Sequence, residues 1–345
     1  MRMASGTRVE DFQSLKSVFG TRVEIDVPLA RLTAARVGGP ADALVSANSL
    51  GELVETVTNL WELQVPFVML GGGSNILVSD AGVRGVVLLN RARQVRFDFH
   101  AHPPTIYAES GANLGLIARQ AAARGLAGLE WAGGIPGTLG GAVVGNAGAH
   151  GGNLAGNLLL AEILHLEEVM DGHPSPNGTR SMRVLHERWP VKKMEYGYRT
   201  SVIKRSPGVK PQGSWPNGQP RMVVLSALLQ VQTSTPEAVQ SKMDEFVSYR
   251  RQTQPPGASM GSMFKNPPGD YAGQLIEAAG LKGTRIGNAE ISPLHANFFI
   301  NHGGASAGEI WSLIQLARSE VAAKFGVALE LEIELVGTWE TEGPG

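Results

Sequence analysis

The sequence predicts an α+β protein with more than one domain. Its 345 residues indicate two or three domains at roughly 150 residues each. Stretches with the alternation of strands are mixed with stretches that carry the apolar stripe of helices, and no repeat of fixed period occurs. Hydrophobic residues make up 43% and charged residues 18% of the chain, as in a globular protein with a sizeable core.

Charge and cysteine content exclude several functions. The 30 Lys and Arg residues against 31 Asp and Glu residues give a formal net charge of −1, so no global positive field attracts nucleic acid or an anionic membrane. The absence of cysteine rules out disulfides, cysteine-ligated zinc and a cysteine nucleophile. Residues 1–12 are too polar for a secretion signal, and no apolar run reaches the ~18 residues of a membrane span. We therefore expect a cytoplasmic protein.

Strands are predicted from short apolar or alternating runs between turn residues. The first unit has strands at 42–47, 67–70 and 85–89 and ends near residue 90. Its helix begins at Ser49, where Glu52 completes a capping box. Two Pro- and Gly-rich stretches, 173–178 and 207–220, are predicted as surface loops. Further strands are predicted at 105–109, 158–166, 180–184, 221–231 and 329–336.

Capping residues mark the other helices, which are predicted at 114–123, 234–252, 271–279 and 306–326. Ser234 begins one of them, with Pro236 in its first turn and Glu237 completing a capping box. Ser306 and Glu309 cap the last helix in the same way. In the final strand the four apolar residues share one face, and Glu330, Glu332 and Glu334 share the other.

Glycine is concentrated at 71–73, 133–141 and 145–152, although the chain has 44 glycines in all. A strand that runs into Gly71-Gly72-Gly73-Ser74-Asn75 presents consecutive N–H groups that can curl around an anion. The cluster at 133–141 supplies a second wall, and two such walls suit a pyrophosphate. Neither GxxxxGK[ST] nor GxGxxG occurs, which argues against a P-loop or a Rossmann site. The alternative, that these glycines only form tight turns, stays open.

Several segments in this order match one protein family. They are 70–78 (LGGGSNILV), 128–138 (GLEWAGGIPGT), 146–149 (NAGA), 198–201 (YRTS), 261–267 (GSMFKNP), 290–292 (EIS) and 295–297 (HAN), with Glu332 in the last strand. The resemblance to this family extends from about Thr33 to Gly337. The chain thereby resembles the MurB family of UDP-N-acetylenolpyruvoylglucosamine reductases.

The resemblance implies a two-subdomain FAD-binding fold of the peripheral-oxidase type and a separate α+β substrate domain. The first FAD subdomain would span 20–90, the second 91–232 with 329–345, and the substrate domain 233–328. Such enzymes hold FAD noncovalently and take a hydride from NADPH. They reduce the enolpyruvyl ether of UDP-N-acetylglucosamine to UDP-N-acetylmuramate for peptidoglycan. We expect a monomer that binds these nucleotides but no nucleic acid or membrane.

The resemblance also implies the roles of individual residues. Hydride would pass from NADPH to flavin N5 and on to substrate C3, while Ser262 protonates C2 and Arg199 and Glu332 stabilise the enolate. Asn266 and Arg250 would bind the substrate. The flavin would contact Gly71, Gly72, Gly73, Ser74, Asn75, Ile135, Pro136, Gly137, Thr138 and Gly140.

The residues alone leave simpler interpretations open. Ser262 could be a turn serine, Arg199 a member of a surface or structural ion pair, and Glu332 a solvated carboxylate. His295 and His302 lack the spacing of a metal site, and we interpret them as structural.

Two features depart from the family pattern: the long stretch 207–220, and the lack of an equivalent for the tyrosine-bearing substrate lid of one branch. Two other functions stay possible, an FAD-dependent alcohol oxidase of the same fold and a sugar-nucleotide transferase or binding protein without flavin.

Overall fold

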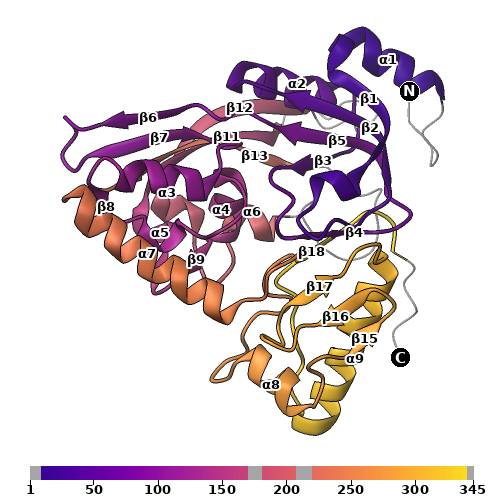
Figure 1. Ribbon diagram of the computed structural model, residues 1–345. Coiled ribbons are helices and arrows are strands. Elements are labelled where there is room, and N and C mark those ends of the chain that lie inside the picture. Colours follow the sequence, from indigo (N-terminus) through magenta and orange to yellow (C-terminus); the bar gives the residue numbers. More distant parts are fainter. Residues whose placement is uncertain (1–8, 170–180, 207–219, 340–345) are drawn as a thin grey trace.

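The computed structural model describes residues 9–169, 181–206 and 220–339 (Figure 1). The helices are α1 Val9–Phe19, α2 Leu50–Glu62, α3 Leu114–Ala122, α4 Leu139–Gly145, α5 Leu154–Asn157, α6 Val202–Arg205, α7 Pro236–Thr253, α8 Ala272–Ala278 and α9 Ala307–Phe325. The strands are β1 Val23–Pro28, β2 Pro40–Ala47, β3 Phe67–Leu70, β4 Ile76–Val78, β5 Val83–Asn90, β6 Val95–Asp98, β7 Thr105–Glu109, β8 Leu126–Ala127, β9 Gly148–Ala149, β10 Gly152–Asn153, β11 Leu158–Val169, β12 Ser181–Pro190, β13 Met222–Gln230, β14 Gln232–Thr233, β15 Arg285–Ile286, β16 Ala289–Ile291, β17 Phe299–Asn301 and β18 Glu334–Val336. The predicted α+β class is confirmed. None of the helices in these ranges is long and apolar enough to cross a membrane.

The first unit is a four-stranded sheet in the order β1-β2-β5-β3. Strands β2, β5 and β3 run parallel, and β1 is antiparallel to β2. Helix α2 buries its apolar stripe, including Leu53 and Leu60, as predicted. Ser49 caps α2 by accepting the N–H of Glu52 at 3.2 Å. The predicted capping box is wrong in its second half, because the Glu52 carboxylate accepts the N–H of Asn48 at 2.8 Å instead.

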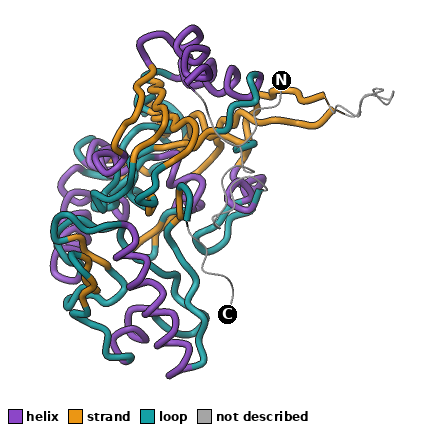
Figure 2. Tube along the Cα trace, turned by 90° about the vertical axis from the view of Figure 1, so that its right-hand side faces the viewer, coloured by secondary structure: helices purple, strands orange, loops and turns teal. Residues whose placement is uncertain are grey.

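The second unit is a five-stranded antiparallel sheet in the order β12-β11-β13-β7-β6. Strands β11 and β12 form a long arm that projects from the body (Figure 2). Helices α3 and α4 cover the sheet, and α7 runs along them (Figure 1). The buried face of α7 places Val239 and Met243 in the same core.

The start of α7 corrects the prediction. Thr235, not Ser234, caps the helix and accepts the N–H of Ala238 at 3.3 Å. Pro236 occupies the first helical position, so the cap must be the residue directly before it. Ser234 is held in the preceding loop, where its N–H donates to the carbonyl of Gly125 at 2.7 Å.

The third unit follows α7 and packs α8 and α9 beside the short sheet β15-β16-β17. Figure 1 shows it below the two sheets. The capping box of Ser306 and Glu309 is confirmed, with both reciprocal bonds present. Gly326 ends α9 in the left-handed conformation, with φ of 68°, which glycine adopts without steric cost.

The predicted strand 329–336 is shorter than expected. Leu331 forms a bridge with Phe264, and the chain then bends before β18, which pairs in parallel with β4 of the first unit. The chain therefore changes partners at Glu332, and a continuous alternation cannot persist through that change. This return ties the end of the chain to its beginning.

The predicted domain boundaries stay a prediction. Packing crosses two of them, because α7 contributes to the core of the second unit while Leu329 and Ile333 belong to the core of the third. The loops predicted at 173–178 and 207–220 lie outside the described residues, apart from Pro220.

Two side chains join the third unit to the first. Asn301 is 6% exposed. Its Nδ2 donates to the carbonyl of Ala35 at 2.9 Å, and its Oδ1 accepts two N–H groups of the turn before α9. The Asp80 carboxylate, which follows β4, accepts the N–H groups of Ala307 and Gly308 at 2.8 and 2.9 Å. These bonds orient α9 against the first unit.

Replacing Asn301 with Ala should lower the free energy of unfolding by about 2 kcal/mol or more, since it leaves buried backbone groups without partners. Urea denaturation measures this change. As a control, Asn153→Ala removes the exposed cap of α5 and should cost about 1 kcal/mol. Equal losses of unfolding free energy in the two variants would show that the buried bonds of Asn301 stabilise the protein no more than an exposed helix cap does.

Candidate active site

The two predicted glycine walls face each other and touch. A Cβ atom on Gly72 would lie 3.1 Å from the Cα of Gly137, and one on Gly137 would lie 2.5 Å from the Oγ of Ser74. Gly137 also has φ of +110°. Both conditions require glycine, one for close approach and the other for its backbone angle. The loops 71–75 and 133–141 are therefore one structural element made of two segments.

This element carries backbone donors that the protein does not use. Within the described chain, the N–H groups of Gly72, Gly73, Ser74, Gly137 and Thr138 donate no hydrogen bond outside the strand ladders. Unpaired backbone donors cost free energy unless water or a ligand accepts from them. Their number on two facing loops fits the phosphates of a dinucleotide cofactor such as FAD.

Other predicted flavin residues are already engaged in the protein. The N–H groups of Ile135 and Gly140 donate to the carbonyls of Ala132 and Ser110. The Ser74 hydroxyl donates to the carbonyl of Pro136 at 3.4 Å. The side chains of Ser74 and Asn75 both have protein partners, and their hydrogen bonds fix the loops.

Asn75 links the flavin loop to the C-terminal segment. Its Nδ2 donates to the carbonyl of Glu332 at 3.1 Å, and its own carbonyl accepts the N–H of Glu334 at 2.9 Å. The first glycine loop therefore sets the position of Glu332, the predicted catalytic glutamate.

Arg199 lies in a loop that α4 holds in place. The hydroxyl of Tyr196 donates to the carbonyl of Val143 at 2.9 Å, and that of Ser201 to the carbonyl of Val144 at 2.6 Å. Asn146 adds a bond to the same loop, to the carbonyl of Gly197. Arg199 itself has φ of +55°, a left-handed conformation that is unfavourable for a side chain of its size. The loop therefore stores strain at the predicted catalytic residue.

The structure brings Arg199 and Glu332 into direct contact. Arg199 Nε lies 2.7 Å from Glu332 Oε1, and the two side chains are 26% and 16% exposed. The contact has the distance of an ion pair but not the alignment of a hydrogen bond, since that N–H has no aligned acceptor. Burial raises the pKa of Glu332, against the opposing effect of Arg199 and then of Lys204 and Lys265. The simpler interpretation, a solvated Glu332, is wrong.

The neighbouring glutamates have their own cations. Glu330 pairs with Lys265 at 3.2 Å and Glu334 with Lys204 at 2.7 Å. Lys265, three residues after Ser262, is thus engaged with the most exposed of the three carboxylates.

Ser262 lies on the segment that passes beside Glu332. The N–H of Glu332 donates to the carbonyl of Met263 at 2.9 Å. On the other side, buried Asn297 accepts the N–H of Phe264 and donates to its carbonyl, at 2.9 and 2.8 Å. Within the described chain the Ser262 hydroxyl has no hydrogen-bond partner. It is held in place by its backbone and remains available to a ligand.

The predicted substrate residues lie on either side of this segment. Arg250, near the end of α7, packs against Gly134, where a Cβ atom would lie 2.9 Å from the arginine Cδ. Burial and the charge of Arg199 lower the pKa of Arg250, so the two guanidinium groups repel each other. Asn266 is exposed, and its Oδ1 accepts the N–H of Ala272 at the start of α8.

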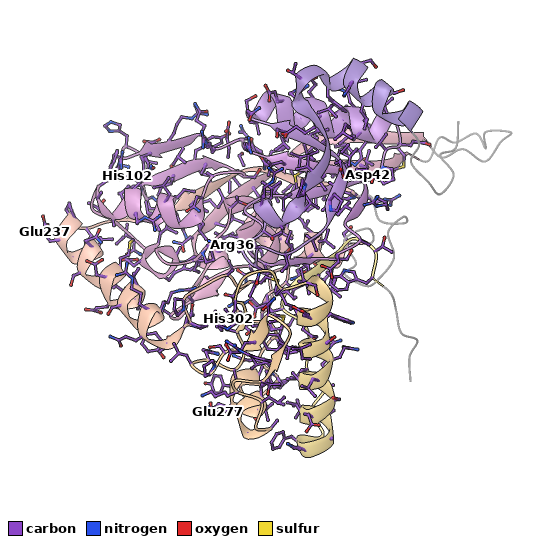
Figure 3. All side chains as sticks on the ribbon, turned by 45° about the vertical axis from the view of Figure 1, so that its right-hand side comes forward. Arg36, Asp42, His102, Glu237, Glu277 and His302 are labelled. Carbon is purple, nitrogen blue, oxygen red and sulfur yellow. The ribbon has the colours of Figure 1, made fainter. Side chains whose placement is uncertain are left out.

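The two histidines that we interpreted as structural have protein partners. His302 contacts the Glu290 carboxylate, and His295 Nδ1 accepts the N–H of Asn297 at 3.3 Å. Among the described residues no three metal-ligating side chains cluster. His302 and Arg36 are among the residues that line a cavity of about 530 Å³. Figure 3 labels these two residues, which lie where the units meet. Neither Arg199 nor Glu332 lines the cavity.

Comparison with known proteins first gives the class. Residues 41–170 match the family described as FAD binding domain. They include both glycine loops, which carry the free backbone donors. The chain is therefore a flavoprotein with its FAD-binding domain in residues 41–170.

Residues 252–336 match the C-terminal domain of UDP-N-acetylenolpyruvoylglucosamine reductase. Reductases of that name from Chloroflexus aggregans and Rubrobacter xylanophilus are each 41% identical to this chain. The first match covers 90% of this chain and 96% of the relative, and the second 91% and 95%. The crystal structure of the Thermus caldophilus enzyme is similar, with a TM-score of 0.69 and 32% identity over 91% of this chain and 99% of that one. The chain belongs to the UDP-N-acetylenolpyruvoylglucosamine reductase (MurB) family of FAD-dependent oxidoreductases.

Sequence reasoning missed residues that act through tertiary contacts. Asn297 is buried and holds the backbone of Phe264 by two hydrogen bonds. The sequence indicated this residue only through its place in the matched segment 295–297. His150 follows the matched segment 146–149 directly, and it packs against α7 beside Arg250. Nothing in the local pattern indicates either contact.

Replacing Gly72 with Val should weaken FAD binding by about tenfold or more, because the side chain would push the two loops apart and displace donors worth about 1 kcal/mol each. Titration of the apoprotein with FAD measures the affinity. Gly156→Val places the same side chain at an exposed position of α5, where a Cβ atom would make only an ordinary contact with Asn153 Oδ1 at 3.8 Å, and this variant should bind FAD normally. Equal affinities for both variants would mean that the loops do not hold the flavin.

Proposed function

We propose that the protein reduces the enolpyruvyl ether of UDP-N-acetylglucosamine to UDP-N-acetylmuramate with NADPH, in the synthesis of peptidoglycan precursors. One observation carries this proposal. Arg199 and Glu332 touch beside the segment of Ser262, and Asn75 connects that group to the flavin loop. The membership of the family supports the same substrates.

Bound FAD supplies the transfer of hydride from NADPH to the enolpyruvyl group, and the protein supplies positioning and electrostatics. The two glycine loops fit the cofactor through their free backbone donors. Gly72, Gly73, Ser74, Gly137 and Thr138 would donate to its phosphates, while Ile135, Pro136 and Gly140 would form the wall beside them.

The cations at the site suit an anionic substrate. Arg199 and Arg250 lie close enough to repel each other, and only Arg199 has a carboxylate partner. A bound diphosphate or carboxylate would relieve that repulsion. We therefore assign Arg250 to the diphosphate of the substrate and Asn266 to its uncharged part, with the exposed Asn266 amide free to donate.

Reduction of the double bond places negative charge on the carboxylate side of the enolpyruvyl group. Arg199 is a permanent cation that stabilises this charge. Because burial raises the pKa of Glu332, its carboxyl group takes up a proton more readily and can then donate a hydrogen bond to the same oxygens. Ser262, with its free hydroxyl, delivers the proton to C2.

We infer that the chain belongs to the branch without a tyrosine-bearing lid. Three tyrosines are each more than half exposed, namely Tyr198, Tyr249 and Tyr271. In the part of the chain that the structure describes, none of them forms a lid. The monomeric state remains a prediction.

Loss of either Arg199 or Glu332 should lower kcat by ~10²-fold or more, with a smaller change in substrate affinity, since both act on charge that develops during the reaction. Steady-state kinetics of Arg199→Met and Glu332→Gln test this. Arg205→Gln removes an exposed neighbouring ion pair and should keep kcat. A raised KM at unchanged kcat would limit the residue to binding.

Ser262→Ala should separate the two halves of the reaction. Bleaching of the flavin by NADPH needs no proton at carbon and should keep its rate. Return of the flavin colour with the enolpyruvyl substrate, without oxygen, should slow by ~10²- to 10⁴-fold, the range for loss of a general acid. Rapid mixing measures both steps. Ser262→Cys should recover part of the rate, and equal slowing of both halves would assign Ser262 to the flavin site instead.

A further inference from the structure

His150 occupies a strained turn. Strands β9 and β10 pair Ala149 with Gly152, so His150 and Gly151 alone connect them. Their φ angles are 51° and 78°, and a two-residue hairpin with both angles positive is a type I′ turn. Asn or Asp is strongly preferred at its first position, and a histidine there carries a steric cost. Strain of this kind points to a role that the fold does not require.

The ring of His150 is fixed by two aromatic side chains of α7. It stacks on Phe246 with ring centroids 4.4 Å apart and planes 5° apart, and Tyr249 meets it edge-on at 5.7 Å. Its Nε2 atom is buried and has no hydrogen-bond partner. Buried polar atoms normally have partners, so a group that binds here accounts for the orphaned nitrogen.

The charge that acts on this ring is positive. The charge of Arg250 acts directly on His150, and Arg199 acts in turn on Arg250. The other ionisable group against the ring is Tyr249. The carboxylate of Glu332 does not face His150 as a free partner, because it is already paired with Arg199. The positive charge of Arg250 beside a ring nitrogen without a partner favours an anion.

We propose that His150, together with Arg250, binds a phosphate group of the nucleotide substrates. The proposal rests on the proposed function, because NADPH and the sugar nucleotide both carry a diphosphate. Access of a ligand to Nε2 would require Tyr249, which meets the ring edge-on and is 59% exposed, to turn outward. Phe246 keeps the ring in place during that movement.

Proton uptake follows from the charges. Burial and then Arg250 lower the pKa of His150 from its ordinary 6.5, so the ring is neutral at pH 7 in the free protein. A phosphate beside it favours the imidazolium and raises the pKa of His150 in the complex. The affinity is therefore highest at low pH and falls as the pH rises through the pKa of the complex.

The test uses calorimetric titration of the FAD-loaded enzyme with UDP and with NADP⁺, in two buffers of different ionisation enthalpy at pH 7. The nucleotide whose phosphate contacts His150 should bind with proton uptake, which tells the two sources apart. His150→Asn should weaken that nucleotide about tenfold to hundredfold, the worth of a charged hydrogen bond, and abolish the uptake. Because Asn suits the turn, its thermal midpoint should equal or exceed that of the wild type.

Two further variants complete the test. His150→Phe keeps the aromatic stack without the nitrogen and should weaken binding as His150→Asn does. His186→Asn changes an exposed histidine on β12 that faces Glu162, and it should change neither affinity nor proton uptake.

Unchanged affinity in His150→Asn overturns the proposal, as does recovery of normal affinity by His150→Phe, which would make the ring purely structural. If the wild type keeps FAD but binds neither nucleotide, the proposed function itself fails.

Discussion

The contact between Arg199 and Glu332 is the constraint on which the arrangement of this protein depends. The two residues come from distant parts of the chain, and separate elements hold each of them. The carbonyls at the end of α4 fix the loop of Arg199, while Asn75 and Met263 fix the backbone of Glu332. The sheets, the glycine loops and the third unit therefore meet at one ion pair.

The contact itself is attractive, but its surroundings carry an electrostatic cost in the absence of a ligand. Burial raises the pKa of Glu332, and the charge of Arg199 contributes to a lowered pKa for Arg250. Arg199 also has a left-handed backbone. Such costs persist only where the surrounding structure enforces them, and they are common where a site is prepared for a charged ligand. The fold supplies that enforcement through many ordinary backbone hydrogen bonds.

Glycine allows close packing at the cofactor loops. Gly72 and Gly137 bring two backbones into contact, and Gly134 leaves room for Arg250. At all three positions a side chain would meet a neighbouring atom too closely. Gly137 has a second reason to be glycine, which is its positive φ. A phosphate-binding role and a packing role are therefore not alternatives here, because the close packing is what aligns the free N–H groups.

The sequence by itself determined the elements and the parts of the site that lie close together in the chain. Periodicity and capping residues predicted α9 with its box of Ser306 and Glu309, and most strands, because those signals are local. The ordered motifs predicted the family. Errors arose where a neighbour competed for the same bond, as at Asn48 and Thr235, or where the chain changed partners, as at Glu332. Only the tertiary structure decided that Glu332 pairs with Arg199 and not with water, that Ser74 and Asn75 fix the loops, and that His150 lies against α7. Each of these depends on which distant groups bury a side chain, and burial is a property of the packed chain that no local pattern contains.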